Sequence, residues 1–450
     1  MMKKLGMFAF VMALVVAFAL PAFAYTVEGA KGERFSMGGS IKYDIGYRNI
    51  DKDRSLRVGD SMTPPGQERT YFFNGVSTST NIYVAFTVGD ISGFANWFTT
   101  VSPGNYHAYQ DNRVLGPTTV NSSYSINSTS ANFSNNSNNA AFDLAYGTYK
   151  FGSMQLQAGK LPAMTVVQVP NPILGYLAEA GGHINGIAYG YMYENKVPAL
   201  RFTHFVNKMF NYGIQISMPS VFGEDANTAA APATGTPQTV NMPSNFTLRD
   251  SYAQYPRIGA RVGINVGPAS INPGFAYEQS KWDGLPAGWT DTVTAWFVRV
   301  PVRLTFGPFV ALLEGLYGQN LGGRTSNQNT MFASESADSM YKRNATGQIL
   351  DANSLNLWFD LAYTFGPVTP HIYFGMTKYY NDKAFKAVPN SDTDSGRTFY
   401  GINAPYKITP NFTIVPEFSL YDLGVVPGAG AKDVKLGKDW LLGLQFQFNF

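Results

Sequence analysis

Apolar and polar residues alternate one by one along most of this chain. The stretch FSMGGSIKYDIGYR, residues 35–48, is a clear case. Its apolar residues, among them Phe35, Ile41 and Tyr47, fall on one face, and its polar residues, among them Lys42 and Asp44, fall on the other. A period of two residues is that of a β-strand, so this stretch predicts a strand whose two faces meet different surroundings.

The same period recurs from this stretch to the end of the chain. Segments 211–218, 257–266, 294–306 and 354–365 alternate as cleanly. Less regular alternation is found at 82–88, 142–150, 154–160, 187–193, 199–206, 308–317, 368–378, 398–408 and 412–420. No amphipathic helix pattern follows residue 24, so the pattern predicts an all-β protein.

The connections between these segments are of two kinds. Short turns rich in Gly, Pro and Asn lie at 266–268, 306–308, 365–367 and 409–411. Long polar connections lie at 50–70, 102–140, 219–252, 318–353, 381–397 and 421–437. Hairpins that stand across an outer membrane have short turns on one side and long loops on the other. We therefore expect an up-and-down antiparallel arrangement with short periplasmic turns and long extracellular loops.

The last segment, WLLGLQFQFNF from Trp440 to Phe450, alternates up to the final residue, so no later residue covers its apolar face. In a β-sandwich two apolar faces meet, and the outer faces are usually well charged. Here the polar faces are mixtures of Gly, Ser, Thr, Gln and Asn with scattered charges. Strands of about ten residues or more can cross a bilayer at a tilt, and in lipid a sheet must close to pair its backbone groups.

These observations predict a transmembrane antiparallel up-and-down β-barrel. A barrel with both termini on one side has an even number of strands. Counts made from the two ends of the chain disagree between residues 141 and 218, so we expect either 16 or 18 strands.

The N-terminus, MMKKLGMFAFVMALVVAFALPAFA, combines Lys3 and Lys4 with an apolar run and the small-residue pattern Ala22-Phe23-Ala24. This pattern predicts a secretory signal peptide over residues 1–24 and a barrel over residues 25–450. A membrane anchor is the alternative, although the apolar run is short for a span.

Composition agrees with a membrane barrel. Charged residues make up 14% of the chain, below the roughly 25% of soluble proteins. The formal net charge is +3 and no basic block occurs, so nothing suggests a nucleic-acid partner. Cysteine is absent, so the fold uses no disulfide bonds.

The leader, the alternation and a closing strand that ends in Phe together resemble a Gram-negative outer-membrane porin. The resemblance implies a water-filled channel for passive diffusion of small hydrophilic solutes and ions, surrounded by outer-membrane lipid and lipopolysaccharide and assembled as a homotrimer. It also implies that the barrel-assembly machinery reads the last strand, at Leu442, Leu444, Phe446, Phe448 and Phe450. A substrate-selective channel and a plugged scaffold or adhesin barrel remain alternatives.

Charged residues on the polar faces are the candidates for lining the pore. They are Lys42, Asp44, Arg201, Arg257, Arg261, Arg299, Arg303, Glu314, Asp360 and Glu417. The resemblance further implies a loop folded into the pore, for which we select residues 161–182 with Glu179. Arginines that face an acidic loop would set a transverse field across the narrow point.

Metal and catalytic chemistry have little support in the sequence. The stretch DTDSG, residues 392–396, begins like a calcium loop but lacks the closing Glu. The histidines, His107, His183, His204 and His371, do not have metal-ligand spacing. We therefore expect no cofactor, no metal site and no enzyme activity.

Overall fold

The protein is a large β-sheet closed on itself. The computed structural model describes residues 25–30, 32–51, 68–77, 80–98, 141–174, 189–194, 196–217, 251–253, 255–282, 285, 287–321, 332–333, 342–343, 347–380, 394–426, 434–435 and 437–450. Within these residues the regular structure consists of strands, and no helix has the length and hydrophobicity needed to cross a bilayer.

The wall is built from strands that pair antiparallel with their neighbours in chain order. The strands of its first half are β2 (Arg34–Ile50), β3 (Arg69–Val76), β4 (Asn81–Val88), β5 (Ile91–Phe98), β6 (Ala141–Phe151), β7 (Met154–Leu161), β9 (Val197–Phe205), β10 (Phe210–Ser217), β11 (Ser251–Ala253) and β12 (Arg257–Val266). Those of the second half are β13 (Ala269–Ile271), β14 (Gly274–Trp282), β15 (Thr292–Phe306), β16 (Phe309–Gln319), β20 (Asn353–Tyr363), β21 (His371–Tyr380), β22 (Asp394–Asn403), β23 (Tyr406–Thr409), β24 (Phe412–Asp422) and β27 (Lys438–Asn449).

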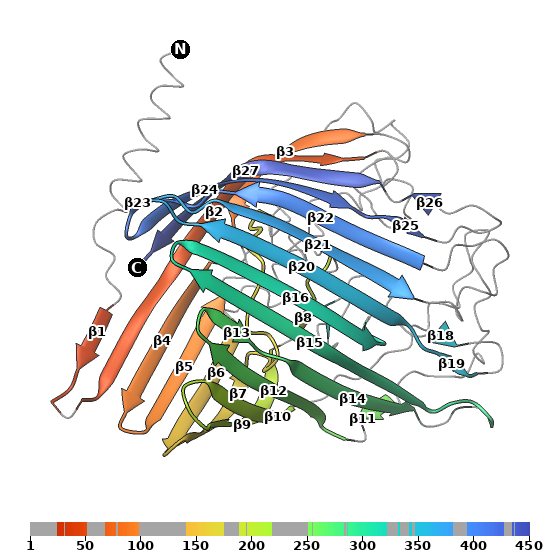
Figure 1. Cartoon of the computed structure of the whole chain (residues 1–450), viewed down its shortest axis with the longest axis horizontal. Helices are drawn as coiled ribbons and strands as arrows, with labels where there is room; N and C mark the ends of the chain where they lie inside the picture. Colours follow the sequence, from red (N-terminus) through yellow and green to blue (C-terminus); the bar gives the residue numbers. More distant parts are fainter. Residues whose placement is uncertain are drawn as a thin grey trace, which may run out of the picture.

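The sheet closes where its last strand meets its first wall strand. β27 pairs with β2 from Asn449 opposite Ser40 to Asp439 opposite Ile50, and the other edge of β2 pairs with β3 and β4. Figure 1 shows the blue end of the chain beside the red end. The N-terminal strand β1 (Tyr25–Glu28) pairs with β2 just beyond the end of β27. Closure leaves the main ring without an open edge.

In four places two consecutive strands lie end to end along the same neighbouring strand and together cross the wall once. These pairs are β3 with β4, β11 with β12, β13 with β14, and β22 with β23. Counted in this way the barrel has 16 strands, which confirms one of the two expected numbers. The disagreement between the two counts came from segment 187–193. Its prediction as a wall strand was wrong, because its described residues lie inside the barrel and end in β8 (Tyr193–Glu194), which pairs with β17 (Phe332–Ala333). The remaining short strands are β18 (Lys342–Arg343), β19 (Ile349–Leu350), β25 (Val425–Val426) and β26 (Val434–Lys435).

Turns and long connections lie at opposite ends of the barrel, as expected. Two-residue turns follow β4, β6, β12, β15 and β23. The "FGP" turns at 306–308 and 365–367 contain Gly307 and Gly366, whose φ angles are 56° and 58°. This left-handed conformation suits glycine because it has no Cβ.

The alternation of the sequence separates two faces of the wall. Large apolar side chains on the outer face are exposed, for example Ile214 and Ile216 on β10 and Leu442 on β27, each about half exposed. In lipid, each such Leu or Ile gains roughly 1.5–3 kcal/mol relative to water. On the inner face the alternate residues are polar and buried, for example Gln215 and Gln445.

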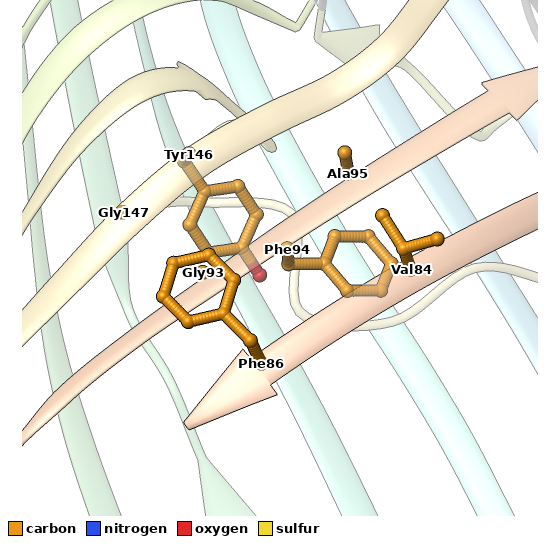
Figure 2. Close-up of a pocket in the computed structure, with 7 residues that line it drawn as sticks. All are labelled: Val84, Phe86, Gly93, Phe94, Ala95, Tyr146 and Gly147. Carbon is orange, nitrogen blue, oxygen red and sulfur yellow. The ribbon is translucent and has the colours of Figure 1, made fainter. Parts of the chain in front are cut away.

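One part of the outer face is recessed. Over β4 to β6 a groove of about 250 Å³ is lined on the outer face by Val84, Phe86, Gly93, Ala95 and Gly147. Phe94 and Tyr146 also border it, although their positions in the strand register belong to the inner face. The groove forms because Gly93 and Gly147 lack side chains, and the Phe86 ring lies over Gly93 (Figure 2). Its lining is apolar, in keeping with a surface that faces hydrocarbon.

Candidate pore interior

The connection between β7 and β9 enters the barrel and lies against the inner wall. Two parts of it are described, an outgoing segment of residues 162–174 and a return segment of residues 189–194. On β24 the outgoing segment contacts Glu417, in the middle of the strand, while the return segment contacts Tyr421, four residues further toward the loop end. The two segments therefore lie at different depths of the same wall.

Polar contacts hold the outgoing segment to one strand after another. Arg201 of β9 donates to the carbonyl of Pro162, and Arg261 of β12 donates to that of Met164 at 3.3 Å. Further along, the Gln168 amide donates to the Leu313 carbonyl of β16 at 2.7 Å. These contacts attach the outgoing segment to β9, β12 and β16.

The end of the outgoing segment is held by two carboxylates. The backbone N–H of Asn171 donates to Asp360 at 2.9 Å. The N–H groups of Ile173 and Leu174 donate to the two oxygens of Glu417, at 2.6 and 3.3 Å. Hydrogen bonds to a charged acceptor are the stronger kind, so these carboxylates act as anchors for the loop backbone.

The return segment packs closely on the wall. Gly190, at φ 112°, donates its N–H to Thr377 at 2.7 Å. A Cβ at Gly190 would collide with the Leu357 carbonyl and with the backbone of Gly375, so only glycine allows this approach. On either side, Tyr189 meets the Tyr421 ring edge-on at 5.2 Å, and Tyr191 meets Trp358 in the same way at 6.0 Å.

Buried charge and an apolar cluster complete the attachment of the return segment. Glu194 pairs with Arg257 of β12 and also accepts a hydrogen bond from Thr165 of the outgoing segment. Arg299 of β15 donates to the Met192 carbonyl. Met192 itself packs in an apolar cluster on the inner face with Ala276, Val293, Ala295, Phe297, Leu316 and Leu321.

The ten charged residues selected from the sequence all lie on the inner face by strand register, but they differ in exposure. Six are buried: Asp44, Arg257, Arg299, Glu314, Asp360 and Glu417. Their partners include Gln445 for Asp44 at 2.7 Å, Glu314 for Arg299 at 3.3 Å and His371 for Asp360 at 2.8 Å. The other four keep solvent exposure, with Lys42, Arg201 and Arg261 partly exposed and Arg303 exposed.

The selected loop and its acidic residue are only partly described. In the interval 161–182, Leu161 ends wall strand β7 and residues 162–174 lie inside the barrel, whereas Glu179 lies outside the described residues. Sequence reasoning missed Glu194, the carboxylate that pairs with Arg257, because it directly follows a segment interpreted as wall strand. A second buried pair, Arg48 with Asp439 at 2.6 Å between β2 and β27, was also missed.

In the described part of the chain, no three His, Asp or Glu side chains gather as they would around a metal ion. Residues 392 and 393 lie outside that part, and the rest of the stretch 392–396 begins strand β22. His371 is engaged with Asp360.

Comparison with known proteins identifies the architecture. No protein-family model matches the chain, and no curated protein sequence matches it. Among solved structures, the outer membrane channel DcaP of Acinetobacter baumannii is 14% identical with a TM-score of 0.58, over 94% of this chain and 99% of that one. The anion-selective porin from Comamonas acidovorans is 12% identical with a TM-score of 0.50, over 93% of this chain and all of the other. The chain has the 16-stranded barrel fold of outer-membrane porins.

Proposed function

We propose that the protein is a passive channel of the bacterial outer membrane that admits small hydrophilic solutes and prefers anions. The observation that carries this proposal is the division of the barrel into an apolar outer face and a polar inner face that retains exposed charge. A sheet with an apolar outer face suits lipid, and a polar inner face suits a water-filled path rather than a packed apolar core.

The sign of the preference follows from which charges remain exposed. Carboxylates of the inner face, including Asp44, Glu314 and Glu417, are buried in contacts with the wall or the loop. Among the ten selected charges, the exposed or partly exposed ones are the cations Lys42, Arg201, Arg261 and Arg303. Fixed positive charge along a narrow path raises the local concentration of anions. One of the matched barrels is an anion-selective porin, but at 12% identity the argument depends on the charges of this chain.

Further parts of the proposal concern location and partners. Residues 1–24 serve as a cleaved signal peptide, and the terminal strand with Leu442, Leu444, Phe446, Phe448 and Phe450 directs assembly by the barrel-assembly machinery. Outer-membrane lipid and lipopolysaccharide surround the barrel, which forms a homotrimer. Residues 161–182 with Glu179 form the constriction, and the protein is not an enzyme.

The experiment is electrical recording from the purified mature protein in planar bilayers. We expect stepwise, ohmic conductance in KCl, because an aqueous path needs no gating event to conduct. Absence of conductance after verified insertion would contradict the proposal and favour the plugged scaffold. Strong block by one solute at low concentration would favour the substrate-selective channel.

A further inference from the structure

Three aromatic rings lie in a row on the inner face of the wall. They belong to a part of the wall that the return segment does not contact. They are Tyr83 on β4, Phe94 on β5 and Tyr146 on β6. The Tyr83 and Phe94 rings are stacked with centroids 6.0 Å apart, and the Phe94 and Tyr146 rings are tilted at 5.7 Å. Figure 2 shows the Phe94 and Tyr146 rings projecting from neighbouring strands.

Strand register places this row inside the barrel. Phe94 lies opposite Tyr146, and Tyr146 lies opposite Gly159 of β7. Two residues further along on the same face, Gln157 of β7 donates a hydrogen bond to Thr148 of β6 at 3.2 Å. Gln157 in turn lies opposite Arg201 of β9. The outer positions of these strands carry Phe86, Ile91 and Tyr149 instead, all exposed on the lipid side.

The three rings differ in exposure from the other inner-face aromatics. Tyr373, Phe399 and Tyr421 are fully buried within the wall that the loop covers. Tyr83, Phe94 and Tyr146 each remain partly exposed. Exposed aromatic rings cost free energy in water unless something covers them, so a continuous partly exposed row suits a ligand with its own flat apolar face.

A cation lies at the end of the row. Across β7, Tyr146 lies opposite Gly159, and Arg201 lies opposite Gln157, two residues away on the same face of β7. Because Gly159 has no side chain, none projects beside Tyr146 at that position. Arg201 and Tyr146 interact electrostatically, and the nearby Arg261 adds a second positive charge. Arg201 donates to Gln215 at 3.0 and 2.7 Å, which fixes the direction of the guanidinium while leaving it partly exposed.

We propose that this row, Tyr83, Phe94 and Tyr146 with Arg201 at its end, is a binding site in the pore for small aromatic carboxylates. The rings stack against the flat face of the solute, and the Arg201 guanidinium receives its carboxylate, for which its planar donors are well suited. Weak stacking on successive rings lets a solute bind and leave. The site deepens the proposed function and rests on it, since it needs an aqueous channel.

The test compares two monoanions of similar size in bilayer recordings of the whole protein. Benzoate has a flat aromatic ring, whereas cyclohexanecarboxylate has the same charge on a puckered saturated ring. We expect benzoate to halve the current at about a tenfold lower concentration, because ring stacking and cation–π contact need a flat π-system. Equal blocking concentrations in a conducting wild-type channel would overturn the inference while leaving the channel function intact.

Variants test which residues cause the stronger block by benzoate. The double variant Phe94→Leu with Tyr146→Leu should lose the preference for benzoate, and Arg201→Gln should weaken block by both anions. Tyr149→Leu is the matched control, since Tyr149 is an aromatic residue of the same strand on the outer face. If the double variant does not insert, Tyr146→Leu alone takes its place. A benzoate preference that survives these inner-face changes would place binding elsewhere, and loss of KCl conductance in the wild type would remove the channel and the site together.

Discussion

Replacing Lys42, Arg201, Arg261 and Arg303 by glutamine is expected to move the reversal potential of the channel toward cation preference. These four are the selected pore-lining charges that keep solvent exposure on the inner face. Charge lining a low-dielectric path changes local ion concentration by about 10-fold to 1,000-fold. We therefore expect the anion-to-cation permeability ratio to fall by about tenfold in dilute salt. A KCl gradient across a planar bilayer measures it.

A matched control removes the same amount of positive charge from the outer face. Lysines near the loop end of the outer face, by strand register, are Lys160, Lys281, Lys378 and Lys438. Their replacement by glutamine should leave the reversal potential close to the wild-type value. The inner-face effect should also shrink in 1 M KCl, where the screening length is about 3 Å. Equal shifts in the two variants would show that net charge, rather than the pore lining, sets selectivity.

The substitution Glu194→Ala is expected to release the loop from the wall. Glu194 is buried, pairs with Arg257 and accepts a hydrogen bond from Thr165, so it joins the return segment to both the wall and the outgoing segment. Removing one partner of a buried ion pair costs roughly 3–5 kcal/mol, because the remaining charge stays desolvated. We expect larger, noisier single-channel currents and faster trypsin cleavage at Lys196, with the barrel still folded.

The control for this variant is Asp439→Ala. Asp439 forms another buried pair, with Arg48, within the wall between β2 and β27. Its loss should lower the thermal stability of the barrel without raising conductance or current noise. If Glu194→Ala gave the same current trace as the wild type, the loop would not depend on this pair for its position.

The wall could be derived from the sequence because each residue's face is a local property. Alternation places Ile41 and Tyr43 on one side and Lys42 on the other, whatever the rest of the chain does. The same holds for Arg257 and Arg299, whose inner-face position follows from their strands. Alternation does not show which inner-face residues other parts of the chain cover. It therefore did not distinguish the buried Arg257 and Arg299 from the exposed Arg303.

The loop interior depends on contacts between residues far apart in sequence. Ile173 reaches Glu417 across 244 positions, and Asn171 reaches Asp360 across 189. Segment 187–193 alternates in sequence like a wall strand, yet its described residues, from Tyr189 on, pack against the inner wall instead of joining it. The period of two does not show which strand a segment pairs with, so only the structure distinguishes a wall strand from a segment inside the barrel.

The central claim is that lipid bathes one face of each wall strand and water the other, and spin labels test it directly. The chain has no cysteine, so single cysteines can be introduced at Ile41, Lys42 and Tyr43 of β2 and at Val302, Arg303 and Leu304 of β15. In bilayers, labels at 41, 43, 302 and 304 should collide mainly with oxygen, which dissolves in hydrocarbon. Labels at 42 and 303 should collide mainly with a water-soluble nickel chelate. Nickel accessibility at all six positions would contradict the barrel in lipid and the channel built on it.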